Sequence, residues 1–132
     1  MKKIIGILSI VLFVFIAFQS CTAGFVNTLE ENNETSGSAG ILLAFFWLVA
    51  GILVLISKNS KGVVIFSIVL YLFSGIIALS NTGSVYKDLI VWGWISIIFS
   101  LLLIFHLYRN KKIYTISNKN KIINDDESLN NK

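Results

Sequence analysis

The chain has 132 residues, of which 55% are hydrophobic and 14% charged, and its mean hydropathy is +0.79. Soluble domains carry about 25% charged residues because a water-facing surface needs them, so these values exclude an ordinary soluble domain and predict a membrane protein. The formal net charge of +4 does not indicate a nucleic-acid partner, because the basic residues flank apolar runs instead of covering a polar surface. A single cysteine, Cys21, excludes an internal disulfide framework.

The first apolar run has two interpretations. Lys2 and Lys3 precede Ile4–Phe18, which carries no charge. This run alone would span about 22 Å as a helix, short of the ~30 Å hydrocarbon core, but its extension through small residues predicts a first span over residues 4–22. Two lysines, an apolar run and then small residues are also typical of a secretory signal peptide.

A second feature of this region concerns Cys21. The segment Phe18-Gln19-Ser20-Cys21 resembles a bacterial lipobox, in which cleavage occurs before a lipidated cysteine. Ser20 matches the small residue that precedes the cysteine, whereas Phe18 and Gln19 differ from the usual leucine and small residue. The resemblance implies lipidation of Cys21 and loss of the first span. The alternative is a plain thiol near the outer interface.

Residues 25–39 are predicted to form an acidic loop that contains Glu30, Glu31 and Glu34. We interpret it as a solvated loop, since a hard cation needs several oxygens held in a fixed cage. Two apolar runs follow, over residues 40–56 and 63–79, and the turn between them is too short to be anything but a tight loop. They predict a transmembrane helical hairpin.

A fourth span is predicted over residues 89–107 and ends abruptly at Arg109-Asn110-Lys111-Lys112. We expect Arg109, Lys111 and Lys112 to anchor the chain at the membrane surface, where they could also hold anionic lipid. Residues 111–132 are rich in Asn, Lys and Ser with few apolar residues, and they predict a flexible, disordered tail. The expected fold is therefore all-α: an integral membrane four-helix bundle over residues 1–110, followed by that tail.

The orientation follows from the basic residues. In a four-span arrangement, ten of the eleven Lys and Arg residues fall on one side and only Lys87 falls on the other. Basic residues favour the cytoplasmic side, so both termini and the turn over residues 57–62 are predicted to be cytoplasmic, with the acidic loop outside.

Each predicted span carries one stripe of small or weakly polar residues, which permits close helix contact in lipid. The first stripe comprises Gly6, Ser9, Ala17 and Ser20. The others are Gly40, Ala44 and Gly51 in the second span, Ser67, Ser74 and Ala78 in the third, and Gly93, Ser96 and Ser100 in the fourth. We expect these stripes to face each other inside the bundle.

No pattern of residues predicts catalysis, a metal site or a cofactor. No Asp, Glu, Lys or Arg lies within a predicted span, which argues against proton-coupled transport. Cys21 and His106 fall near opposite faces of the membrane, so they cannot form a catalytic pair. Trp47 and Tyr71 lie near mid-span, where they either line a cavity or act as packing groups.

Residues 2–112 resemble the small four-span membrane proteins of unknown function from low-GC Gram-positive bacteria. The resemblance rests on the basic start, the segment Phe18–Gly24, the segment Ser36–Gly40, and the Ala-Gly-Ile and Ser-Gly-Ile steps of the central spans. It implies a bacterial cell-membrane protein, but no known activity, cofactor or site residue.

Three functional hypotheses follow. The first is a non-enzymatic membrane protein that acts by association with lipid, with other membrane proteins or with itself, as an accessory subunit, an immunity factor or an envelope-stress protein. The second is a small oligomeric channel or transporter whose polar path would be the serine stripes. The third is a membrane lipoprotein cleaved before Cys21.

Overall fold

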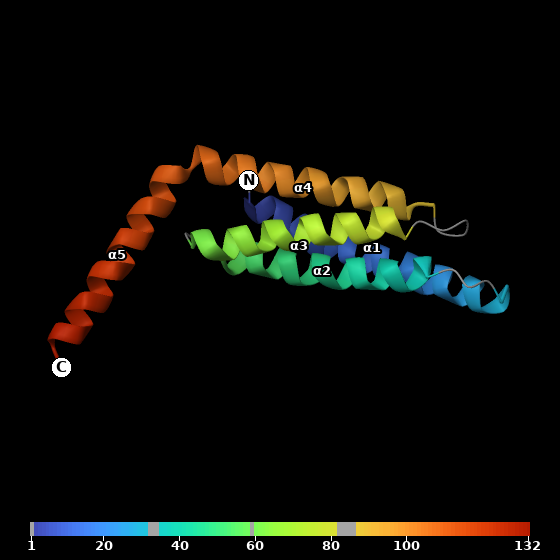
Figure 1. Cartoon of the computed structure of the whole chain (residues 1–132), viewed down its shortest axis with the longest axis horizontal. Helices are drawn as coiled ribbons and strands as arrows, with labels where there is room; N and C mark the ends of the chain where they lie inside the picture. Colours follow the sequence, from blue (N-terminus) through green and yellow to red (C-terminus); the bar gives the residue numbers. More distant parts are fainter. Residues whose placement is uncertain (1, 32–34, 59, 82–86) are drawn as a thin grey trace.

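The computed structural model describes residues 2–31, 35–58, 60–81 and 87–132, which form five helices (Figure 1). These are α1 (Lys2–Leu29), α2 (Ser36–Ile56), α3 (Lys61–Ser80), α4 (Leu89–Arg109) and α5 (Lys111–Asn130). By length and composition, α1 to α4 are each able to cross a membrane. The predicted all-α architecture with four long apolar helices is confirmed.

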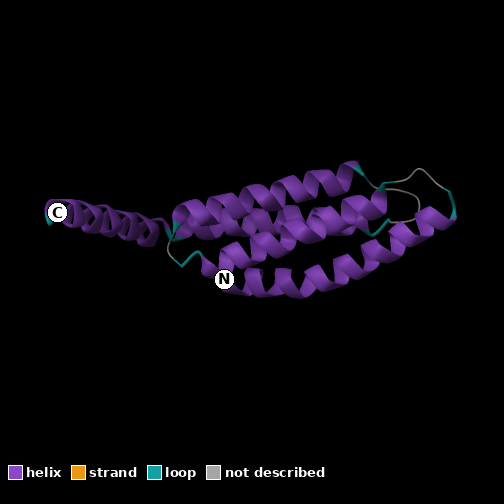
Figure 2. Cartoon of the chain, turned by 90° about the horizontal axis from the view of Figure 1, so that it is seen from below, coloured by secondary structure: helices purple, strands orange, loops and turns teal. Residues whose placement is uncertain are grey.

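Helices α1 to α4 lie side by side, and each runs antiparallel to the next (Figures 1 and 2). Helix α1 packs along α2, α2 along α3 and α3 along α4, whereas α1 and α4 meet in few places. Short connections between long helices favour this order, because a short loop can only join neighbours. Consecutive helices of the bundle therefore pack extensively against each other, whereas the first and last helices contact each other only sparsely.

The sequence explains why these segments are helical. A helix satisfies its backbone hydrogen bonds internally, which a long apolar segment in lipid requires. The chain contains no proline, so no proline kink interrupts a helix. Large apolar side chains remain exposed on the outer faces of all four helices, among them Phe15, Phe45, Phe66 and Phe105. Exposed apolar faces of this extent suit lipid rather than water as the surrounding solvent.

The loop predicted over residues 25–39 is shorter in the structure. Helix α1 continues past residue 22 to Leu29, and α2 begins at Ser36, so much of the predicted loop over residues 25–39 is helical. Thr28 supports this extension by donating its hydroxyl to the carbonyl oxygen of Gly24, at 2.9 Å. Glu34 lies outside the described residues.

The predicted disordered tail also differs from the structure, because residues 111–130 form α5. Helix α5 leaves the end of α4 and points away from the bundle (Figure 1). Almost all of its side chains are exposed, and Tyr114 is the buried exception. The composition of residues 111–132 indicated that they cannot build a hydrophobic core. This part of the prediction fits α5, because the helix has little tertiary packing.

Close contacts between helices depend on glycines. A Cβ atom on Gly37 would lie 2.5 Å from the backbone nitrogen of Gly24 and 2.6 Å from its Cα. A Cβ atom on Gly51 would lie 3.0 Å from the carbonyl oxygen of Gly6. Both contacts join α1 to α2, and backbone atoms cannot move aside as a flexible side chain can. These two glycines therefore set how closely α1 and α2 approach.

Gly37→Ala should destabilise the bundle by about 1–3 kcal/mol, because the added methyl group forces α1 and α2 apart. Gly24→Ala is the matched control at the same contact, since a Cβ atom there meets nothing within 4 Å. Both changes gain helix propensity, so the control should be neutral or stabilising. Thermal unfolding in detergent measures both, and equal unfolding temperatures would contradict the close contact.

Candidate functional site

A buried group of hydroxyl and aromatic side chains lies where the four long apolar helices α1 to α4 meet. We call it the aromatic–hydroxyl centre; it comprises Ser9 of α1, Trp47 of α2, Tyr71 and Ser74 of α3, and Ser96 and Phe99 of α4. Five of these side chains are fully buried, and Phe99 is 7% exposed. Each of the four helices thus contributes at least one residue.

Ser9 and Tyr71 connect α1 to α3. The Ser9 Oγ and the Tyr71 hydroxyl are 2.5 Å apart. Ser9 also donates to the carbonyl oxygen of Ile5, at 2.8 Å. The Tyr71 hydroxyl can therefore donate to Ser9, while Ser9 directs its own proton to the backbone. Tyr71 would otherwise bury a phenol in an apolar interior, which is costly.

Trp47 connects α2 to α4. Its Nε1 donates to the Ser96 Oγ at 2.6 Å. Its ring packs edge-on against Tyr71, with centroids 6.0 Å apart, and at a tilt against Phe99, with centroids 5.2 Å apart. These separations are typical of favourable aromatic pairs. Trp47 therefore fills the interior between α2, α3 and α4.

Three serines of the interior bond to the backbone of their own helix. Ser74 donates to the carbonyl oxygen of Tyr71 at 2.9 Å, Ser96 to that of Trp92 at 3.0 Å, and Ser67 to that of Val63 at 3.0 Å. Local bonds of this kind make a hydroxyl tolerable in an apolar interior. The Ser100 hydroxyl is buried and has no hydrogen-bond partner among the described residues.

A second polar contact joins the loosely packed pair α1 and α4. Trp92 donates its Nε1 to the Gln19 Oε1 at 2.9 Å, and its ring packs edge-on against Trp47, with centroids 6.1 Å apart. Gln19 thus has a structural partner in α4. From the sequence alone, we noted Gln19 only as a departure from the lipobox pattern.

The nine predicted packing residues are all buried. They are Gly40, Ala44 and Gly51 in α2, Ser67, Ser74 and Ala78 in α3, and Gly93, Ser96 and Ser100 in α4. Contacts between them cross the helix pairs. A Cβ atom on Gly93, for example, would lie 3.2 Å from the Cβ of Ala78. Of the two interpretations open for Trp47 and Tyr71, the structure favours packing groups.

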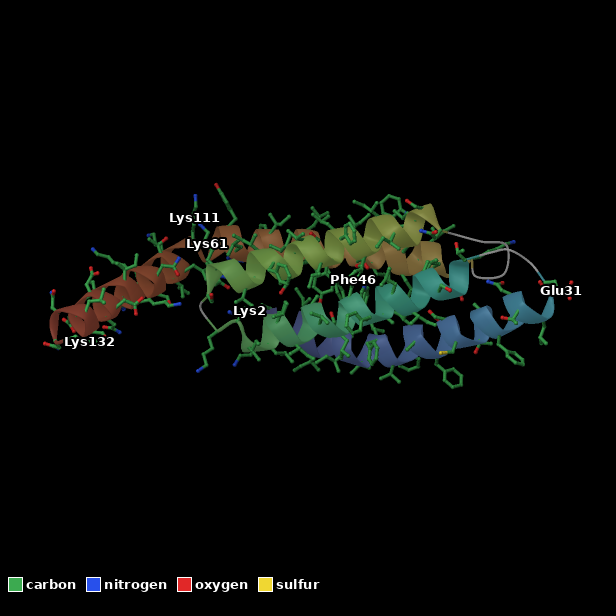
Figure 3. The ribbon with its side chains drawn as sticks, turned by 60° about the horizontal axis from the view of Figure 1, so that its bottom comes forward. Lys2, Glu31, Phe46, Lys61, Lys111 and Lys132 are labelled. Atoms are coloured by element: carbon green, nitrogen blue, oxygen red, sulfur yellow. The ribbon has the colours of Figure 1, made fainter. Side chains whose placement is uncertain are left out.

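The charged residues gather at the two ends of the bundle. Lys2, Lys61 and Lys111 lie at one end, which we call the basic end, and Glu31 lies at the other (Figure 3). Arg109, Lys111 and Lys112, for which membrane-surface anchoring was predicted, are all exposed. Lys111 and Lys112 line a surface hollow of about 300 Å³ together with Thr115 and Ile116.

The bend between α4 and α5 is held by Tyr114, which is 2% exposed. Its ring packs edge-on against His106 at 6.4 Å, and the Lys2 Nζ lies 5.3 Å from its centroid. Asn110 donates its side-chain amide to the His106 carbonyl oxygen at 3.1 Å. Burial raises the pKa of the Tyr114 hydroxyl. None of these contacts was predicted from the sequence, because nothing in a polar tail indicates that its tyrosine is buried.

Cys21 is exposed and lies within α1, well before the helix ends. His106 lies in the last turn of α4, at the basic end. Within the described ranges, no three His, Cys, Asp or Glu side chains come together as metal ligands do. Comparison of the chain with known protein families, with curated proteins and with solved structures finds no match.

Ser9→Ala should destabilise the bundle more than Tyr71→Phe. Loss of the serine oxygen leaves the Tyr71 hydroxyl buried without its partner, at a cost of about 1–3 kcal/mol. Tyr71→Phe removes the hydroxyl itself, and Ser9 keeps its bond to Ile5, so the cost should stay near 0.6 kcal/mol, about the mean for such bonds in membranes.

Unfolding in detergent of the two single variants and of the double variant measures this asymmetry. The double variant should unfold close to Tyr71→Phe, because no hydroxyl is then left without a partner. Strictly additive losses would contradict a direct bond between the two side chains.

Proposed function

We propose that the protein is a non-enzymatic multi-pass protein of the cell membrane that acts by association with anionic lipid and with other membrane proteins. The observation that carries this proposal is that apolar and basic side chains occupy different parts of the molecular surface. The outer faces of α1 to α4 are apolar, the interior is closed by Trp47 and Tyr71, and the basic side chains gather at one end. Such a molecule offers outer surfaces and one charged end for binding.

In this proposal the basic end faces the cytoplasm. Lys2, Lys61 and Lys111 share that end, and basic residues beside a span favour the cytoplasmic side. The turn between α2 and α3 and both termini would then be cytoplasmic, and Glu31 would lie outside. The resemblance to small four-span proteins of Gram-positive bacteria fits this arrangement but adds no activity.

The lipid part of the proposal rests on Arg109, Lys111 and Lys112. They follow the last span directly, where the anionic surface of the inner leaflet would lie. Each basic residue near such a surface contributes about 1 kcal/mol. Lys111 and Lys112 also line the surface hollow next to α4, which places two cations at the start of α5.

Replacement of Arg109, Lys111 and Lys112 by Gln should weaken stabilisation by anionic lipid roughly 100-fold, since three contributions of about 1 kcal/mol are lost. The measurement is the concentration of phosphatidylglycerol that gives half of the maximal rise in unfolding temperature in detergent. The matched control replaces Lys119, Lys121 and Lys132 by Gln. It removes the same number of positive charges, but from positions farther along the chain from α4. An equal loss in both variants would contradict a headgroup site next to α4.

A channel or transporter is the second candidate, favoured by the buried hydroxyls of Ser74, Ser96 and Ser100. The Trp47 ring packs against Phe99 and donates to Ser96, so these large side chains lie next to the serines, which favours association. Reconstituted liposomes should therefore show no protein-dependent flux of ions or small solutes. Flux that Ser74→Ala and Ser96→Ala abolish, with folding retained, would overturn the association proposal.

The lipoprotein alternative concerns the fate of α1. Gly6 and Ser9 of α1 contact Gly51, and Ser9 bonds to Tyr71, so removal of residues 1–20 would take away a partner of both α2 and α3. These contacts support a retained first span. Mass spectrometry of the protein from native membranes separates the two cases, because cleavage leaves a lipid-modified Cys21 at the new N-terminus.

A further inference from the structure

Helix α5 has a regular stripe of exposed side chains with the spacing of a coiled-coil seam. Ile113, Ile116, Asn120, Ile123 and Glu127 follow one another at steps of three and four residues, which places them on one face of the helix. The three isoleucines are between 45% and 61% exposed. Within the part of the chain that the structure describes, no other helix covers this face.

The charges of α5 are divided along its length. All four of its basic residues, Lys111, Lys112, Lys119 and Lys121, precede its acidic residues, Asp125, Asp126 and Glu127, which lie near its end. This order opposes the helix dipole, which favours acidic residues at the start and basic residues at the end. A single α5 in water is thus destabilised by its own charges, although it is long enough to form a helix.

An antiparallel copy of the same helix would remove this conflict. It brings the acidic segment Asp125–Glu127 of one α5 alongside residues 116–118 of the other, next to Lys119, and the two helix dipoles then oppose each other. With the seams facing, Asn120 of one copy stands opposite Ile123 of the second copy. Lys119 then lies beside Asp126 of the second copy, and the same pair recurs on the other side of the two-fold axis.

From this complementarity we propose that α5 is a self-association site, and that two copies of the chain pair through antiparallel α5 helices at the basic end of the bundle. The proposal rests on the proposed function, since it names a second copy as one partner of the membrane protein. Confinement to a membrane raises the effective concentration of α5, which favours pairing through a short and weakly apolar seam.

The membrane surface is a less suitable occupant for this face. A helix that lies in the interface needs its apolar residues on one side. At 100° per residue, Ile122 and Leu129 of α5 point away from the side that carries Ile113, Ile116 and Ile123. Acidic residues near the end of α5 would also be repelled by anionic lipid.

Cysteine crosslinking in washed native membranes tests the proposal, with Cys21→Ala as the background. Asn120→Cys lies on the seam, and Asn118→Cys is the matched control: the same residue type, two positions away on the opposite face of α5, and also exposed. A short bis-maleimide should give a crosslinked dimer with Asn120→Cys and at least several-fold less with Asn118→Cys. Equal yields from the two variants would overturn the proposed seam.

Charge exchange tests the antiparallel arrangement in the same assay. Lys119→Asp alone and Asp126→Lys alone should each lower the dimer yield of Asn120→Cys about threefold to tenfold, because each puts like charges together twice. The two changes combined should restore the yield. Failure of the combined variant to recover, or a crosslink to a different protein in place of the dimer, would overturn the proposal.

The membrane fraction separates this proposal from the one on which it depends. Protein that resists carbonate extraction but gives no dimer overturns α5 pairing and leaves the proposed membrane function intact. Protein that is absent from the membrane fraction overturns both.

Discussion

The hydrogen bond from Trp47 to Ser96 is the interaction on which the interior of the bundle depends most. It joins α2 to α4 and directs the only polar atom of a large side chain to a partner. Around it, the Trp47 ring packs against Tyr71, Trp92 and Phe99, and Tyr71 in turn bonds to Ser9 of α1. In lipid, helices gain little from burying apolar surface, so packing of this kind and a few hydrogen bonds must hold them together.

Much of the fold could be predicted from the sequence because the hydrocarbon core imposes a length on uncharged runs. The hairpin over residues 40–56 and 63–79 lies within α2 and α3, and the fourth predicted span lies within α4. The outer end of α1 could not be predicted in this way. Gly24, Asn27 and Thr28 look like loop residues, but Gly24 meets Gly37 across the pair, Asn27 is buried, and Thr28 bonds to its own helix.

The candidate site was predictable only in part. Steps of three, four and seven residues were enough to place Ser67, Ser74 and Ser96 on inner faces. The side chains that these serines contact on other helices depend on how the helices are placed, and the periodicity of the sequence does not give that placement. Trp47 with Ser96, and Trp92 with Gln19, could be named only once the helices were placed. Helix α5 was missed because its composition predicts too little apolar surface for a core, and it forms without one.

The length of α1 has a consequence for the bilayer around the protein. At 1.5 Å per residue its 28 residues extend about 42 Å, against ~30 Å for the hydrocarbon core. The contacts of Gly51 with Gly6 and of Gly37 with Gly24 tie α1 to α2 along most of its length, so α1 cannot tilt in the bilayer independently of α2. In the proposed membrane arrangement, the last turns of α1, with Asn27 and Thr28, would therefore extend to the level of the headgroups. In a thicker membrane the same turns would be covered by acyl chains, so the surroundings of the Gly24–Gly37 contact depend on bilayer thickness.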